Sequence, residues 1–224
     1  MQAPETPAYP LWDLPTRLFH WLLVLGFLSA WGSYELGLIE VHFYVGYSLL
    51  GLLLFRIGWG LFGSAHARFS DFLRGPGAVI RYLKDGSSPT PGHNPLGGWS
   101  VLLMLLLLLG QTISGLFNAN DSGSEAPYHH LLSGSLADLT GELHESLFDV
   151  LLALLGLHLL AIAFYSLLRH QPLIAAMWRG QAPGKQGKAP PVPVWRAIVI
   201  ALLSAALVAG LVLLAPEPET IAYY

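Results

Sequence analysis

The sequence predicts an all-α membrane protein, a four-helix transmembrane bundle followed by a fifth, C-terminal transmembrane helix. Of the 224 residues, 54% are hydrophobic and only 11% are charged, about half the charged share of an ordinary soluble domain. Five apolar segments each approach the ~20 residues that a helix needs to cross a bilayer. They lack the alternation of polar and apolar residues found in membrane β-strands, so we expect helices.

The predicted spans cover residues 17–34, 42–62, 98–117, 144–168 and 195–214. The first is the weakest because Trp, Ser and Gly dilute it, whereas VLLMLLLLLG and AIVIALLSAALVAGLVLLA are nearly unambiguous. No basic stretch precedes the first apolar run, so we interpret it as a retained span and not as a secretory signal. The loop 118–143 has room for a short surface helix.

We divide the chain into an N-terminal segment, the four-helix bundle, a linker rich in Pro, Gly and Lys, the fifth span and a tail. These parts cover residues 1–16, 17–170, 171–194, 195–214 and 215–224, respectively. The linker composition suggests that the fifth helix is an appendage of the bundle.

The fifth helix carries a group of small residues, and two interpretations of them stay open. They favour either a contact with another subunit, in a homo- or hetero-oligomer, or packing on the bundle of the same chain. The residues are Ser204, Ala205, Ala206, Ala209 and Gly210.

In a chain of five spans, all eleven Lys and Arg residues fall on one side of the membrane. The positive-inside rule makes that side cytoplasmic, with the N-terminus inside and the C-terminus outside. We expect membrane lipid as a partner and no nucleic acid. The opposite, acidic face carries Glu35, Glu40, Asp121, Glu125, Asp138, Glu142, Glu145, Glu217 and Glu219.

The chain contains no cysteine and nine histidines. Without cysteine, disulfides, iron–sulfur clusters, thioether haem attachment and thiolate metal sites are excluded, so any metal is held by nitrogen or oxygen. Polar side chains at membrane depth are costly and tend to have a functional partner. The histidines inside the predicted spans are His20, His42, His144 and His158.

These four histidines fall into two pairs by depth. His144 and His158 are fourteen residues apart on one helix, nearly four whole turns, so both lie on one face about 21 Å apart along the axis. Because successive spans run in opposite directions, His42 shares the outer depth with His144, and His20 shares the inner depth with His158. We therefore predict the pairs His42/His144 and His20/His158.

Two imidazoles that face each other across a four-helix bundle can hold an iron porphyrin between them. With both axial positions filled by protein, the expected chemistry is electron transfer and not oxygenation. The plain alternative is that each histidine only hydrogen-bonds inside the bundle. A zinc site is weaker, because ligands four turns apart cannot reach one ion through bonds of about 2 Å.

Several neighbours suit large flat cofactors. Gly46, one turn after His42, lets a ring approach the backbone, although close helix packing explains it equally well. Arg56, at the depth of the inner pair, and Arg17 are candidate partners for haem propionates; snorkelling to the membrane surface is the alternative.

His93 and Asn94, at the cytoplasmic mouth of the third span, are candidates for contacts with a quinone or a propionate. A quinone headgroup needs hydrogen-bonding groups beside an apolar cleft, which this position could supply. A turn that caps the helix is the plain interpretation.

The segments LPTRLFHW, HFYVGYSLLGLLLFRIGWGLFGSAHARF, GHNPLGGW and LHESLFDVLLALLGLHLLA resemble the bacterial cytochrome b561 and nickel-iron hydrogenase cytochrome b family, over residues 10–180. The resemblance implies two haem b groups ligated by His20, His42, His144 and His158. It also implies electron transfer across the bacterial inner membrane, between a periplasmic partner and the quinone pool. That partner is a cytochrome c or an oxidoreductase such as hydrogenase, and bound ubiquinone or menaquinone is a further option.

The family leaves several roles open. An electron-transfer subunit is favoured over a stand-alone enzyme, with quinone oxidoreductase activity as an option. The alternative is a superoxide oxidase that reduces ubiquinone, but an outer face without cations repels the superoxide anion and better suits a basic cytochrome c. Outside this class, a haem-free membrane scaffold or transporter predicts a colourless protein. The fifth helix departs from the four-helix members, so partner arrangements do not carry over from them.

Overall fold

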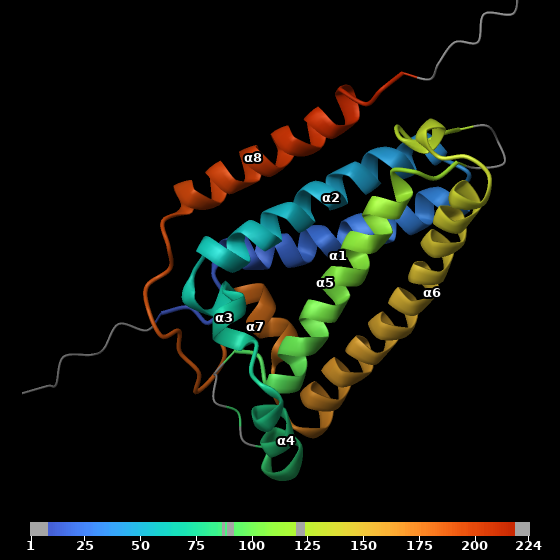
Figure 1. The fold of residues 1–224 in the computed structure, drawn as a ribbon. Helices are drawn as coiled ribbons and strands as arrows, with labels where there is room; N and C mark the ends of the chain where they lie inside the picture. The colour runs from blue at the N-terminus through green and yellow to red at the C-terminus, as the bar shows by residue number, and fades with distance from the viewer. Residues whose placement is uncertain (1–8, 87, 89–91, 120–123, 218–224) are drawn as a thin grey trace, which may run out of the picture. The chain divides into compact units, whose positions relative to one another are not determined.

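The computed structural model describes residues 9–86, 88, 92–119 and 124–217 (Figure 1). Within these ranges the chain is helical, and its only β-type pairings are two isolated bridges, Ala119 with Glu125 and Ala182 with Lys185. The all-α prediction is therefore confirmed. Parts of the predicted N-terminal segment and tail, residues 1–8 and 218–224, lie outside the described residues, as do the acidic residues Asp121 and Glu219.

The five predicted helices are all present. They are α1 (Leu14–Glu35), α2 (Ile39–Phe62), α5 (Pro95–Gly115), α6 (Ser135–Ala163) and α8 (Val194–Leu213). The largest difference from the sequence prediction is the start of α6 at Ser135 rather than at 144, because the helical stretch expected in the preceding loop is continuous with α6.

Short helices fill the connections. They are η1 (Ala65–Ala67), α3 (Phe69–Phe72), α4 (Pro76–Asp85), η2 (His129–Leu131), a π-helical turn η3 (Phe164–Leu168) that continues α6, and α7 (Leu173–Arg179). The ends of α4 follow from its residues: Pro76 opens the helix with its φ already fixed, and Gly86 closes it at φ 72°.

By length and composition, four helices of the described chain can cross a membrane. They are Ile39–Phe62, Pro95–Gly115, Ser135–Leu168 and Val194–Leu213. Helix α1 has 22 residues, enough for a span, but its polar side chains keep it outside this set. The protein is thus an all-α membrane protein, and the expectation that α1 is a fifth span stays a prediction.

The chain divides into two compact units, and each long helix contributes residues to both. Unit 1 comprises Met1–Trp21, Arg56–Leu103 and Leu155–Ile200, and unit 2 comprises Leu22–Phe55, Met104–Leu154 and Ala201–Tyr224. His20 and His158 belong to unit 1, whereas His42 and His144 belong to unit 2. The division therefore separates the four histidines into the two pairs that the depth argument predicts.

Unit 2 is held by apolar packing. Leu53, Leu108 and Leu151 bring α2, α5 and α6 together in one cluster. In a second cluster, Val208 of α8 packs against Leu50 of α2. Helix α8 is therefore packed on its own chain in this unit.

The small residues of α8 divide between two environments. Ser204 is buried, whereas Ala205, Ala206 and Ala209 are exposed. A subunit contact through these alanines stays a prediction.

In unit 1 the segment before α1 is bound on several sides. Asp13 caps α1, because its Oδ1 accepts a hydrogen bond from the Thr16 amide at 3.0 Å. Its Oδ2 accepts a bond from Trp59 Nε1 of α2, also at 3.0 Å. Trp12 packs against Ala176 of α7. The hydrogen bond between the Trp59 indole and the Asp13 carboxylate thus joins the end of α2 to the start of α1.

The linker before α8 is attached to unit 1 and does not run free. The Lys188 amide donates to His66 Nε2 at 3.2 Å, and Lys188 Nζ donates to Asp71 Oδ1 at 2.7 Å. The Val192 amide donates to Ser64 Oγ at 3.1 Å. These contacts make residues 187–192 a strap, a feature that the Pro, Gly and Lys content does not predict.

Candidate haem sites

His42 on α2 and His144 on α6 lie close together in unit 2, with one ring edge-on to the other. Their ring centroids are 6.3 Å apart and the ring planes are inclined by 76°, and both side chains are half-buried. Two metal–nitrogen bonds of about 2 Å, plus about 1 Å from each nitrogen to its ring centre, sum to about 6 Å. The spacing of the two imidazoles therefore fits one metal centre between them.

The His42 ring is oriented by the backbone of α1. Its Nδ1 lies 2.8 Å from the Ala30 carbonyl oxygen, and because a carbonyl only accepts, Nδ1 carries the hydrogen. The lone pair is left on Nε2, the arrangement that metal-bound histidines commonly have. The short turn between α1 and α2, with Gly37 at φ 69°, brings the two helices into contact at this depth.

His144 is oriented in the same way by α5. Its Nδ1 lies 3.0 Å from Ser114 Oγ, and the Ser114 hydroxyl donates its own hydrogen to the Gln111 carbonyl at 3.0 Å. Ser114 Oγ therefore accepts from His144 Nδ1, which again leaves the lone pair on Nε2. A Cβ at Gly115 would lie 3.0 Å from His144 Cε1, so glycine makes room for the ring.

The surroundings of this pair include open space and aromatic side chains. A Cβ added to Gly46 would meet nothing within 4 Å, although the residue is half-buried. On the α1 side, Phe148 of α6 stacks on Phe27 with centroids 6.1 Å apart and meets Trp31 edge-on at 5.7 Å. The spacing of the two imidazoles and the open space at Gly46 fit a flat metal macrocycle, which the nitrogens of His42 and His144 would hold.

The unit 1 pair is less fully oriented. His20 on α1 and His158 on α6 lie close enough for their charges to interact, and both are half-buried. The Nδ1 atom of His20 is buried and has no hydrogen-bond partner among the described residues. Buried polar atoms are rarely left without a partner, so this nitrogen indicates a site that a further group completes.

Arg56 of α2 lies in the same unit and is almost fully buried, with 3% of its surface exposed. Its guanidinium carbon is 5.9, 5.0 and 5.9 Å from the ring centroids of Phe19, Phe69 and Phe72. The Nη1 atom has no hydrogen-bond partner in the described chain. A buried guanidinium with an unused donor is costly unless an anion pairs with it, so Arg56 suits a carboxylate such as a haem propionate.

Arg17 contacts the end of α7, and its role as a propionate partner stays a prediction. Its Nε donates to the Met177 carbonyl at 3.3 Å, and its Nη2 contacts the Trp178 carbonyl. Both carbonyls belong to the last turn of α7, where a cation stabilises the unpaired acceptors of a helix end. Arg17 thus joins α1 to α7.

His93 and Asn94 precede α5. His93 lies between two rings, with centroid distances of 4.7 Å to Trp12 and 4.9 Å to Phe72. Burial, followed by the positive charge of Arg56, lowers the pKa of His93 to about 3, so its ring is neutral near pH 7. Asn94 Oδ1 accepts the Gly97 amide at 2.7 Å, which makes Asn94 the cap of α5.

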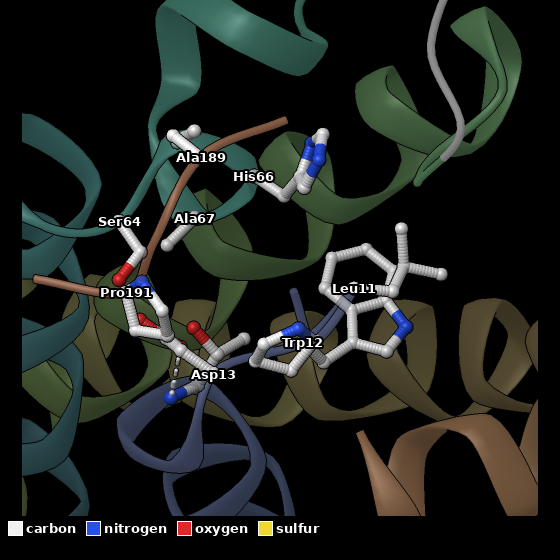
Figure 2. Close-up of a pocket in the computed structure, with 11 residues that line it drawn as sticks. Leu11, Trp12, Asp13, Ser64, His66, Ala67, Ala189 and Pro191 are labelled. Atoms are coloured by element: carbon white, nitrogen blue, oxygen red, sulfur yellow. Dashed lines mark hydrogen bonds between the residues drawn. The ribbon is translucent and has the colours of Figure 1, made fainter. Parts of the chain in front are cut away.

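A small cavity lies beneath the N-terminal segment of unit 1 (Figure 2). Trp12, Asp13, Ser64 and His66 are among its lining residues, and the four paired histidines are not. The cavity has room for about one water molecule. Thr16 Oγ1, on its wall, is buried without a hydrogen-bond partner, so a single water fits here and a quinone does not.

The sequence predicted four histidines as candidate haem ligands but did not indicate Ser114 and Gly115. Both residues contact His144. Their only signal is a polar and a small residue inside an apolar helix, in QTISG. Among the described residues, no group of three or more His, Cys, Asp or Glu lies together as a metal site.

Comparison with known proteins identifies the family. The family described as prokaryotic cytochrome b561 matches residues 11–180, the range that contains both histidine pairs. No curated protein and no solved structure matches the chain. The matched range covers most of the chain, and the helical membrane fold agrees with it. The chain therefore belongs to the prokaryotic cytochrome b561 family, and it is a membrane b-type cytochrome of electron transfer.

Proposed function

We propose that this cytochrome binds two haem b groups, one between His42 and His144 and one between His20 and His158. It passes electrons across the bacterial inner membrane between a periplasmic redox partner and the quinone pool. The observation that carries the proposal is the arrangement of His42 and His144, whose rings lie 6.3 Å apart with both Nδ1 atoms hydrogen-bonded. A haem b held by two imidazoles supplies one-electron transfer and leaves the iron no position for oxygen.

The residues around each pair have distinct tasks in this proposal. The Ala30 carbonyl and Ser114 Oγ hold the two unit 2 imidazoles in the tautomer that presents Nε2. Gly46 leaves space for the macrocycle beside His42. In unit 1, Arg56 supplies a buried cation for a propionate. In this proposal the described residues thus bind, orient and charge-balance the cofactors.

The proposed redox partners follow from charge and from the neutral His93. The basic-free, acidic face predicted for the outer side favours a basic cytochrome c or the basic patch of an oxidoreductase. To test this preference, the rate at which reduced cytochrome c reduces this protein is measured at low and high ionic strength. The rate should fall as the salt concentration rises. A rate that does not depend on salt would exclude this steering. The ring N–H of a neutral His93 can donate a hydrogen bond to a quinone carbonyl, which supports a quinone contact on the side predicted to be cytoplasmic.

The experiment that tests the two-haem proposal counts haem in alanine variants of the four histidines. We expect about two haems per chain in the unmodified protein and about one in each single variant. The double variant His42→Ala/His144→Ala should retain one haem, because both ligands serve the same site. The cross-pair variant His42→Ala/His158→Ala should retain none.

A matched control is His170→Ala, since His170 is exposed just after η3 and its loss should not change the haem content. If the same-pair double variant loses all haem while the cross-pair variant keeps one, the pairing is wrong. If the unmodified protein is colourless when haem is supplied during expression, the scaffold or transporter interpretation replaces this one.

A further inference from the structure

Helix α4 has an apolar face that unit 1 does not cover. At about 100° per residue, Pro76, Val79, Ile80 and Leu83 fall within one arc of about 100°. Ile80 is 53% exposed and Leu83 is 66% exposed, and no residue of α4 is buried. A ten-residue helix with a clean apolar face of this kind is typical of a segment that lies in a membrane surface.

Cations border this face. Lys84 follows Ile80 by one turn, and Arg81 lies beside it on the polar side of the helix; both are exposed. Among the described residues, the ion pairs are made by His66 and Lys188 with Asp71, so neither cation of α4 takes part in one. Arg74, just before the helix, has a buried Nε without a hydrogen-bond partner in the described chain. The charge at this edge therefore favours an anionic partner.

The start of α4 is tied to a residue typical of the membrane–water interface. Trp99, near the start of the apolar helix α5, is 46% exposed, and its Nε1 donates to the Arg74 carbonyl at 2.8 Å. Exposed tryptophans near the ends of spans lie at the depth of the lipid headgroups. Because Pro76 follows Arg74 by two residues, α4 begins at about that depth.

The rotation of α4 is fixed by a second contact. The hydroxyl oxygens of Tyr82 and of Tyr165 in η3 are 2.5 Å apart, and Figure 1 shows α4 near the ends of α5 and α6. Burial, together with this hydrogen bond, raises the pKa of Tyr82 to about 12, so the contact persists at physiological pH. Leu83, the next residue, is turned by about 100° from Tyr82 and points away from η3.

From these observations we propose that α4 is an interfacial helix that binds anionic phospholipids of the nearest leaflet. Ile80 and Leu83 enter the upper acyl-chain region, while Arg74, Arg81 and Lys84 contact the headgroup phosphates. The occupant is a lipid because the face combines apolar side chains at interface depth with a cationic edge that makes no ion pair among the described residues. The proposal depends on membrane insertion and not on haem binding.

The test uses the absence of cysteine from the chain, which allows one introduced thiol to be labelled specifically. Leu83→Cys carries an environment-sensitive fluorophore on the apolar face. Gly77→Cys is the matched control on the polar side of the same helix, where a Cβ meets nothing within 4 Å. In proteoliposomes containing phosphatidylglycerol, we expect lipid-attached nitroxide to quench the probe at 83 strongly and the probe at 77 weakly. The reverse order would overturn the proposed orientation.

The charge selectivity is tested by titrating phosphatidylglycerol into mixed micelles of the labelled protein. The variant Arg81→Gln/Lys84→Gln should need a higher mole fraction of this lipid for half-saturation, by about fivefold for each cation removed. Phosphatidylcholine should not replace phosphatidylglycerol. An unchanged midpoint in the variant, or equal responses to the two lipids, would overturn the assignment of an anionic-lipid site. Haem content and the far-ultraviolet circular dichroism spectrum check that each variant is folded.

Discussion

The two units of this cytochrome position their histidines by different means. In unit 2, neutral hydrogen bonds orient His42 and His144 within a leucine-rich core. In unit 1, His20 Nδ1 has no such partner in the described chain, and the same unit contains the buried cation of Arg56. We infer that unit 2 fixes ligand geometry in advance, whereas unit 1 tunes its site mainly by charge.

The largest expected effect is the selective loss of one haem. Gly46→Leu places a side chain in the open space beside His42 and should abolish haem binding at unit 2, leaving about one haem per chain. The control is Gly210→Leu on α8, where a Cβ also meets nothing within 4 Å. Haem content is measured by pyridine haemochrome. Two haems in Gly46→Leu would show that this space is not part of the site.

A smaller effect is expected from the hydrogen bond to His144. Ser114→Ala removes the acceptor of His144 Nδ1, and the loss of such a partner weakens metal affinity by about 10- to 100-fold. Haem should therefore dissociate from unit 2 faster, with unit 1 unaffected. Thr112→Val is the matched control, since the Thr112 hydroxyl bonds only to carbonyls of its own helix. Equal haem retention in both variants would contradict a preorganised unit 2 site.

The contribution of charge in unit 1 is tested by the reduction potential. A cation near a haem disfavours the oxidised, more positive form, so Arg56→Gln should lower one of the two potentials by on the order of 60 mV, which is a tenfold change for one electron. Arg56→Lys retains the charge and should largely restore the potential. Spectroelectrochemical titration separates the two transitions. A shift of both potentials, or of neither, would remove the distinction between the units.

The smallest effect concerns the strap of unit 1, where Asp71 is paired with Lys188 and His66. Burial opposes ionisation, but the hydrogen bonds from Lys188 and His66 outweigh it and lower the pKa of Asp71 below its ordinary value of 3.8. The stabilisation is therefore complete above about pH 4 and is lost as the pH falls through the folded-state pKa.

Because Asp71 and Lys188 are partly exposed, the contribution is below about 1 kcal/mol. Thermal unfolding of Asp71→Asn should show a slightly lower midpoint near pH 7 and a weaker decrease toward pH 3 than the unmodified protein. An identical pH dependence in both proteins would exclude the pair as a stabilising contact.

The sequence predicted the five long helices and the grouping of the histidines because both depend on regular geometry. Apolar length locates a span, and fourteen residues between His144 and His158 fix a common face. The hydrogen bond from His42 to the Ala30 carbonyl could not be predicted from the sequence, because it depends on how α1 and α2 pack against each other. For the same reason the contact of Arg17 with the end of α7 could not be predicted from the sequence.

Local chemistry that depends on packing was also unpredictable. The Lys188 contacts with His66 and Asp71 turn a linker of flexible composition into a strap, and no short-range pattern indicates partners more than a hundred residues away. Asn94 is the counterexample. One of its two sequence interpretations was a cap of α5, and the structure shows that cap. A cap can be predicted because it depends only on residues close in sequence.

The most direct test of two differently built haem sites is a redox titration of the purified protein together with its haem count. The account predicts about two haem b per chain and two resolved one-electron transitions, one of which shifts to lower potential in Arg56→Gln while the other is affected by Ser114→Ala. A single haem, or one transition that responds equally to both substitutions, would contradict it.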